Sequence, residues 1–294
     1  MNLTVPQAHY ETNCACLEAG KHIYCEKPFV LNTSEGDDLL RRGREKGLRV
    51  GCAPDTFMSA TVQTARKLIV DGWIGEIIGT SATMFSTTHG NENWHPSPEF
   101  FYKPGAGPLY DMGGYFVNHM VQLCGPVKDV FSMNTITFPR RKIVTEPLYG
   151  KMIDVEVPTH LVSVFHYASG AIGQMTFSWD AWNHRQPDLE IYGTEGTLSL
   201  GFPGWYNEPI LMSRHSCGKD KWDQIPLMDE MRVSARGIGL ADMCCAIREG
   251  RPHRANGELA LHTFEFFKAI ERSGETGEPV RLETTCDIPA ERWR

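Results

Sequence analysis

A lysine that follows a predicted strand is the first candidate for chemistry. The segments Thr4-Val5-Pro6-Gln7-Ala8-His9 and Gly20-Lys21-His22-Ile23-Tyr24-Cys25-Glu26-Lys27-Pro28 each contain a short apolar run that ends in a loop. If these runs are adjacent parallel strands, both loops lie at the carboxyl ends, where open α/β sheets bind ligands. In a partly dehydrated cleft, Lys27 could take or return a hydroxyl proton, and Glu26 could orient it. The alternative is a surface lysine beside a turn-forming proline.

A second group of polar side chains shares one stripe of a predicted helix over residues 107–124. At about 100° per residue, Asp111, Tyr115, Asn118 and Gln122 fall on that stripe, and apolar side chains cover the other side. The stripe either belongs to a site or is a polar face turned to water, with Asp111 near the positive end of the helix.

Short elements of alternating type must position the lysine. We expect strands at 2–5, 22–25 and 49–52, a helix at 6–17, and a second helix that a residue among 32–34 caps and that ends near 46. This order is typical of one half of a doubly wound nucleotide-binding fold. The other half, which carries the Gly-rich turn for the pyrophosphate, normally comes first, and no such unit precedes residue 2. The two later Gly-x-Gly sequences lack the third glycine and an evident preceding strand, so we do not interpret them as that turn.

From about residue 74 the pattern changes to alternating strands with turn signals. Hairpins are predicted at 161–179 and 189–200, and helices at 59–71, 107–124, 235–249 and 256–272. The predicted fold is therefore α/β: a truncated Rossmann-like parallel sheet in residues 1–54, followed in residues 55–294 by an α+β domain. Its large, mostly antiparallel open sheet would carry helices on one face.

Composition excludes several classes of function. The 29 Lys and Arg residues against 36 Asp and Glu give a net charge of -7, which argues against a nucleic-acid partner. No apolar run approaches the roughly 20 residues that span a bilayer, and we predict a cytoplasmic protein with no membrane partner. The nine cysteines form no disulfide framework and no Cys-x-x-Cys pair, and histidines such as His89 and His160 lack metal-binding spacing. We predict reduced thiols and no metal.

Three motifs together resemble those of the glucose-fructose oxidoreductase and inositol dehydrogenase family, often written Gfo/Idh/MocA. They are Thr-x-Pro-x-x-His from Thr4, Gly-Lys-His-Ile-x-x-Glu-Lys-Pro from Gly20, and Gly-Pro-Leu-x-Asp-x-Gly-x-Tyr from Gly107. Further similar stretches, such as Glu190-Ile191-Tyr192-Gly193-Thr194-Glu195-Gly196, extend the resemblance along essentially the whole chain.

The resemblance implies an NAD- or NADP-dependent oxidoreductase that transfers a hydride to or from a sugar, polyol or related cyclic alcohol. By matching position, Lys27 is similar to the catalytic lysine of the family and Asp111 to its sheet-domain acid. Tyr115 stands where many members have histidine, and a nearby ammonium would help it to donate a proton to a carbonyl. Whether Tyr115, His119 or Lys27 carries the proton stays open. The expected cofactor-binding residues are Thr4, Pro6, His9, Glu26, Lys27 and Pro28.

Aromatic and polar residues of two loops are candidates for the substrate pocket, because aromatic faces with scattered polar groups suit sugar rings. Packing of these aromatic residues against the sheet is the alternative, and Arg236 and His253 are weaker candidates. The substrate-binding candidates are Trp94, His95, Tyr102, Asn118, His119, Trp179, Asp180, Trp182 and His184.

The absence of the Gly-rich half leads to two further expectations. We expect poor cofactor binding by the chain as written, and a start at an internal methionine of a longer protein. A second hypothesis is a non-catalytic sugar-binding or regulatory protein that has lost cofactor binding. An NAD-dependent glycosidase is a third, which no residue selects. An open sheet with an apolar face also predicts a homo-oligomer.

Overall fold

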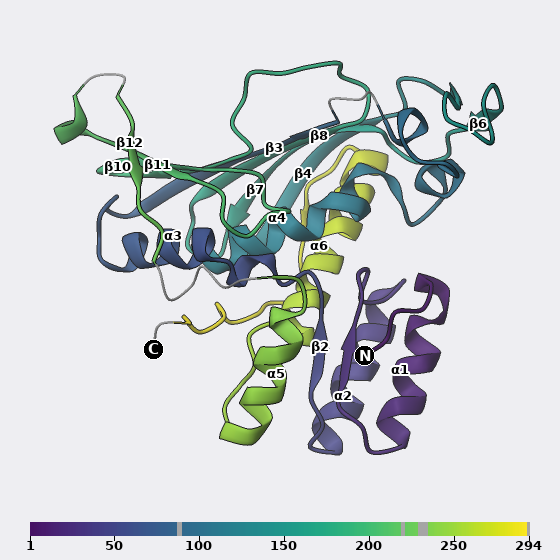
Figure 1. Ribbon diagram of the computed structural model, residues 1–294, viewed down its shortest axis with the longest axis horizontal. Helices are drawn as coiled ribbons and strands as arrows, with labels where there is room; N and C mark the ends of the chain where they lie inside the picture. The colour runs from purple at the N-terminus through teal and green to yellow at the C-terminus, as the bar shows by residue number, and fades with distance from the viewer. Residues whose placement is uncertain (87–89, 219–220, 229–234, 293–294) are drawn as a thin grey trace.

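One small parallel sheet and one large sheet organise the chain in the computed structural model (Figure 1). The structure describes residues 1–86, 90–218, 221–228 and 235–292. The helices are α1 (His9–Glu18), α2 (Thr33–Glu45), α3 (Ala60–Val70), α4 (Gly107–Cys124), α5 (Ile238–Glu249) and α6 (Gly257–Thr276). The strands are β1 (Ile23–Cys25), β2 (Val50–Cys52), β3 (Ile77–Phe85), β4 (Val127–Thr135), β5 (Arg140–Lys142), β6 (Met152–Asp154), β7 (His160–Tyr167), β8 (Ile172–Ser178), β9 (Leu189–Gly193), β10 (Gly196–Leu200), β11 (Ile210–Arg214), β12 (Asp223–Ile225) and β13 (Val280–Arg281).

The small sheet pairs β1 with β2 in parallel, and every residue of both strands is buried. The strand predicted at 2–5 is reduced to a single bridge from Asn2 to Cys25. The Asn2 side chain accepts the main-chain N–H of Thr4 at 3.1 Å, and Pro6 begins a short 3₁₀ helix, Pro6–Ala8. The chain therefore turns away from β1 after one residue.

Side-chain caps fix the starts of three helices where the sequence predicts them. Asn32 accepts the N–H of Glu35 at 2.9 Å and so begins α2, and Ser59 caps α3 in the same way. Asn256 caps α6 through the N–H of Leu259 at 2.8 Å. Such caps satisfy amide groups that have no partner within the helix.

The large sheet has the strand order β12-β11-β10-β9-β3-β8-β7-β4-β13. Both predicted hairpins are present, as β7–β8 and β9–β10. β3 pairs in parallel with β8, whereas the other pairs in this sheet are antiparallel. The helices α3, α4 and α6 lie on one face of the sheet, and Figure 1 shows no helix over the opposite face.

The last two helices return to the small sheet. α5 and α6 both contact β2, and α6 also contacts α2. Cys52 donates its N–H to the carbonyl of Ala255 at 3.2 Å, and Gly51 forms a bridge with Asn256. The region between the two sheets is thus built from segments near both ends of the chain. No helix in the described part of the chain is long and apolar enough to cross a membrane.

Candidate active site

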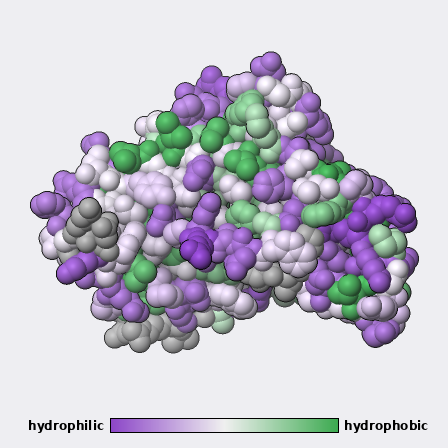
Figure 2. All heavy atoms as spheres, turned by 90° about the horizontal axis from the view of Figure 1, so that it is seen from above, coloured by the Kyte–Doolittle hydropathy of each residue, from purple (hydrophilic) through white to green (hydrophobic). Residues whose placement is uncertain are grey.

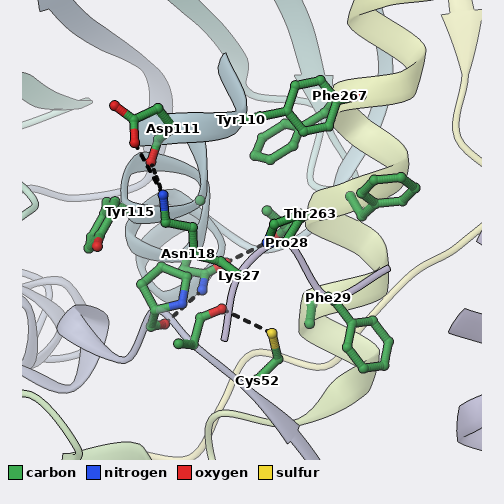
Figure 3. Close-up of a pocket in the computed structure, with 15 residues that line it drawn as sticks. Lys27, Pro28, Phe29, Cys52, Tyr110, Asp111, Tyr115, Asn118, Thr263 and Phe267 are labelled. Atoms are coloured by element: carbon green, nitrogen blue, oxygen red, sulfur yellow. Dashed lines mark hydrogen bonds and ion pairs between the residues drawn. The ribbon is translucent and has the colours of Figure 1, made fainter. Parts of the chain in front are cut away.

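Lys27 and Asp111 meet although 84 residues separate them in the sequence. The Lys27 Nζ atom donates to the Asp111 main-chain oxygen at 2.9 Å and to its Oδ1 at 3.2 Å (Figure 3). Lys27 lies in the loop after β1, and Asp111 lies in the second turn of α4. The two side chains are 29% and 26% exposed, so the pair is open to a ligand. Because an ammonium has three hydrogens, one N–H remains for that ligand. This contact favours a site over a surface lysine.

A cavity of about 400 Å³, including its open mouth, surrounds this pair; we call it the lysine cavity. Its walls come from the loops after β1 and β2, from α4 and from α6 (Figure 3). They are mainly apolar, with polar groups at Lys27, Asp111, Tyr115, Asn118 and Thr263. The lining residues are Lys27, Pro28, Phe29, Cys52, Ala53, Pro54, Tyr110, Asp111, Gly114, Tyr115, Asn118, Ala260, Thr263, Phe264 and Phe267.

The polar stripe of α4 does not face water. Asn118 and Gln122 are buried because α4 lies between the large sheet, the β2 loop and α6. Asn118 donates to the Pro54 carbonyl at 3.0 Å and accepts the Thr263 hydroxyl at 2.8 Å. Gln122 donates to the Pro289 carbonyl at 3.2 Å. The water-facing interpretation of the stripe is therefore wrong, and Asn118 joins three parts of the site.

Tyr115 lies one helical turn after Asp111, and its side chain lines the lysine cavity to one side of Lys27 (Figure 3). Arg236 donates from Nη1 to the Tyr115 hydroxyl at 3.3 Å. This hydrogen bond is the main reason that the pKa of Arg236 is raised. A phenol that accepts a hydrogen bond from a cation keeps its own O–H free to donate.

Asp55 fixes the backbone next to Arg236. Its buried carboxylate accepts the Tyr206 hydroxyl at 2.7 Å and the main-chain N–H groups of Gly237 at 3.1 Å and Gly239 at 2.8 Å. Burial, followed by the hydrogen bond to Asp55, raises the pKa of Tyr206. The Asp55 carboxylate thus caps the start of α5 and fixes Gly237, the residue that follows Arg236.

The predicted cofactor residues lie together at the carboxyl ends of the small sheet. The His9 ring is buried, with Nδ1 at 2.8 Å from the Pro28 oxygen and Nε2 at 3.0 Å from the Thr4 oxygen. Glu26 accepts the main-chain N–H of Lys27 at 3.0 Å. His9 therefore joins the two loops, and its buried ring favours positioning over direct contact.

A second cavity meets the first at Asp111; we call it the aromatic cavity. Its volume is about 860 Å³ including its open mouth. Trp94, Trp179 and His184 line it, as their aromatic character predicts for a sugar pocket. Trp94 is 55% exposed, while Trp179 is buried. The lining residues are Met84, Phe85, Ser86, Asn91, Trp94, Asp111, Met112, Trp179, His184, Asp188 and Phe202.

Tyr102 and Asp180 lie behind this cavity in a buried ionic network. Arg141 donates from Nη1 to Glu92 Oε1 at 2.7 Å, and from Nη2 to Asp180. The Tyr102 hydroxyl donates to Glu92, and the Thr159 hydroxyl donates to Asp180 Oδ2 at 2.9 Å. Their burial favours a role in supporting the cavity wall over direct contact with a substrate.

Three other candidates lie outside both cavities. His95 packs edge-on against Trp94 and is not among the lining residues, and Trp182 is 70% exposed. His119 is buried on α4, and burial lowers its pKa to about 3. A histidine that stays neutral and lines neither cavity is poorly placed to exchange a proton with substrate, so its position argues against that alternative.

Several residues of the site have no evident signal in the sequence. Asp188 and Asn91 line the aromatic cavity only because separate loops meet there. Asp55 could have been found, because it follows β2 at the carboxyl end of a parallel strand. Among the described residues, no group of three or more His, Cys, Asp and Glu side chains is arranged to hold a metal. His89 lies outside the described residues.

Two family models match the chain. Residues 3–53 match the model described as "Oxidoreductase family, NAD-binding Rossmann fold", and residues 62–199 match "GFO/IDH/MocA C-terminal domain". The matched ranges contain Lys27, Asp111 and Tyr115, and together they cover most of the chain.

Curated relatives and solved structures agree with this match. Levoglucosan dehydrogenase of Pseudarthrobacter phenanthrenivorans is 25% identical over 66% of the chain and 53% of its own length. The NADP(+)-dependent scyllo-inositol 2-dehydrogenase of Bacillus subtilis is 29% identical over 44% of the chain and 35% of its own length. The chain therefore matches only about a third to a half of these relatives. The structure of a levoglucosan dehydrogenase with NADH and levoglucosan superimposes with a TM-score of 0.78 at 22% identity, over 96% of the chain and 80% of that structure.

Proposed function

The chain belongs to the Gfo/Idh/MocA family of oxidoreductases, and we propose that it transfers a hydride between a nicotinamide cofactor and a ring carbon of a sugar, polyol or related cyclic alcohol. The observation that carries this proposal is the contact of Lys27 with Asp111 at the junction of the two cavities. It joins a residue of the nucleotide-binding part to a residue of the sheet domain, beside Tyr115.

The lining of the lysine cavity suits the flat ring of a nicotinamide. Pro28 and Pro54 form apolar walls at the carboxyl ends of the two parallel strands, and Tyr115 forms another side. Thr4, Glu26 and the Lys27 loop would hold the cofactor, and NAD and NADP both remain candidates. When bound, the nicotinamide accepts or supplies the hydride.

Lys27 is placed to bind the reacting oxygen of the substrate. Two of its three N–H groups go to Asp111, which fixes the direction of the third. That N–H can hydrogen-bond the substrate hydroxyl and stabilise negative charge that develops on its oxygen. Asp111 keeps the ammonium at the junction of the cavities.

Tyr115 is the proposed proton donor in the direction of carbonyl reduction. Its hydroxyl accepts from Arg236, so its own hydrogen can pass to the carbonyl oxygen as that carbon receives the hydride. In the reverse direction, the phenolate oxygen would take the hydroxyl proton, and Arg236 would stabilise it. The aromatic cavity would hold the ring, with Trp94 and Trp179 against its apolar face.

The test is the turnover of sugars and polyols with NAD and with NADP by the purified protein in a full-length version, followed by nicotinamide absorbance. We expect Lys27→Met to lower turnover by about 10²–10⁴-fold, the usual contribution of a positioned acid–base group. Lys21→Met is the matched control, because Lys21 is exposed at the other end of β1 and lines neither cavity. It should retain wild-type turnover.

A loss of less than about tenfold for Lys27→Met would refute the assigned role. Saturable sugar binding with no nicotinamide binding, by protein from a gene that has no upstream in-frame coding, would refute the oxidoreductase and favour the sugar-binding alternative. Fluorescence titration with NADH and NADPH separates the two results.

We also propose that the open face of the large sheet binds a second copy of the chain. Figure 2 looks onto this side of the molecule and shows hydrophobic side chains among polar ones. Met133 and Val162 are register partners on β4 and β7, and they are 70% and 41% exposed. Val164 on β7 and Ile172 on the neighbouring β8 are also exposed. Light scattering should give a dimer or larger oligomer, and Val164→Asp should reduce its mass.

The predicted cytoplasmic location remains part of this proposal. Cysteine side chains at eight positions are free thiols. Free thiols suit a reducing compartment. Fractionation of cells that produce the protein would test the location directly.

A further inference from the structure

Two polar side chains in the aromatic cavity are not used by the proton-transfer proposal. Asp188 immediately precedes β9, and its main-chain oxygen accepts the N–H of Thr83 at 2.8 Å, which fixes it beside β3. Its half-buried carboxylate makes no hydrogen bond within the described part of the chain. Burial raises the pKa of Asp188, with Glu208 acting in the same direction and His184 against it.

Asn91 contributes the second group. It is only 4% exposed, and its Oδ1 accepts the indole N–H of Trp94 at 2.8 Å. Its Nδ2 atom is buried and has no acceptor among the residues that the structure describes. A buried donor without a partner is costly, and a ligand that supplies an acceptor removes that cost.

A hydroxyl group satisfies both side chains, because it donates to a carboxylate and accepts from an amide. The rest of the cavity suits the apolar face of a ring: Phe85 and His184 stack with centroids 4.8 Å apart, and Trp179 and Phe202 lie close by. Scattered polar groups on aromatic walls are the usual composition of a small-molecule site.

We propose that Asp188 and Asn91 are specificity residues that bind hydroxyl groups of a neutral sugar or polyol ring in the aromatic cavity and select against sugar acids. This inference rests on the proposed function, because the bound ring must present its reacting carbon at Lys27. It names a narrower substrate class than that function requires.

The charges around the cavity support the exclusion of acids. None of its described lining residues is Lys or Arg, whereas Asp111 and Asp188 both line it and Glu208 acts on Asp188. Lys27, at the junction with the lysine cavity, is already paired with Asp111, and Arg141 behind the wall is paired with Glu92 and Asp180. A carboxylate or phosphate on the ring would therefore lie near the negative charges of Asp111 and Asp188 and would find no positively charged partner. Such repulsion is an effective way to reject a ligand.

Calorimetric binding of D-glucose, myo-inositol and D-glucuronate to the full chain tests this proposal. We expect the wild type to bind at least one neutral ring at least tenfold more tightly than D-glucuronate. Asp188→Asn should weaken neutral-ring binding about tenfold or more and narrow the difference from D-glucuronate. Asp154→Asn, which changes a 73%-exposed acid outside both cavities, should bind as the wild type does. Melting curves of each variant check the fold.

Deoxyglucoses make the test specific to hydroxyl groups. Removal of the hydroxyl that contacts Asp188 should weaken binding to the wild type more than binding to Asp188→Asn, because the asparagine offers that hydroxyl only a neutral hydrogen bond. The proposal is overturned if no deoxyglucose shows this coupling, if D-glucuronate binds as tightly as the neutral rings, or if D-glucosamine binds more tightly than D-glucose. Because binding is read without turnover, a chain that binds these sugars and oxidises none refutes the proposed function alone.

Discussion

Loss of Arg141 should destabilise the fold strongly, because its guanidinium neutralises two buried carboxylates. Arg141, Glu92 and Asp180 have side chains only 2%, 5% and 6% exposed. Arg141→Met would leave both carboxylates buried without their cation, and removal of one partner of a buried pair costs about 3–5 kcal/mol. We therefore expect a loss of about 4 kcal/mol in the free energy of unfolding, and a melting temperature roughly 10 °C lower.

Urea unfolding followed by circular dichroism measures this loss, and the neighbouring residue provides a control. Arg140 is 64% exposed and pairs with Asp154 at the surface, so Arg140→Met should change stability by less than about 0.5 kcal/mol. The triple variant Arg141→Met, Glu92→Gln, Asp180→Asn removes the charges together and should recover most of the lost stability. An Arg141→Met variant within about 1 kcal/mol of the wild type would refute the reasoning.

Two further predictions concern the Asp55 cap and His119. Asp55→Ala removes three hydrogen bonds to a buried carboxylate, so we expect urea unfolding to show a loss of about 3 kcal/mol in the free energy of unfolding. We also expect a lower kcat, because the backbone next to Arg236 is no longer fixed and Arg236 is no longer held at Tyr115. An unchanged kcat in a folded variant would contradict this link between Asp55 and Tyr115. Burial lowers the pKa of His119 to about 3, whereas the unfolded chain titrates near 6.5, so the unfolded state binds more protons between these values and stability falls as pH falls. From pH 8 to pH 5, the wild type should lose about 2 kcal/mol more of its free energy of unfolding than His119→Gln does. If the urea midpoints of the wild type and of His119→Gln change equally between these pH values, His119 has no such effect.

Capping residues, glycines, prolines and hydrophobic periodicity predicted many of the helices and strands, but not which other segments these elements contact. The helix at 107–124 was predicted with the bounds that the structure gives, because Pro108 and Gly125 mark its ends. The strand at 2–5 was not found, since the Asn2 side chain and Pro6 turn the chain away. The polar stripe of α4 was open to two interpretations, because periodicity shows which side of a helix is polar but not whether that side contacts water or other parts of the protein.

The candidate site divides in the same way. Lys27, Asp111 and Tyr115 were predicted from motifs, and the structure brings them to one cavity. Asp188 and Asn91 could not be predicted, because no spacing indicates that two loops nearly a hundred residues apart share a wall. Tyr102 was predicted as a contact from its residue type, and only its burial behind the cavity identifies it as a supporting aromatic residue.

The return of the final helices to β2 has a consequence for synthesis of the protein. The free edge of β2 is covered through Ala255 and Asn256, and the Val50 carbonyl meets the His253 ring 203 residues further along the chain. On the ribosome, the small sheet must therefore wait for nearly the whole chain before its last partners emerge. Meanwhile the β2 edge can pair with other nascent chains, so chaperone supply during translation should affect the yield of this protein more than that of one whose contacts are local.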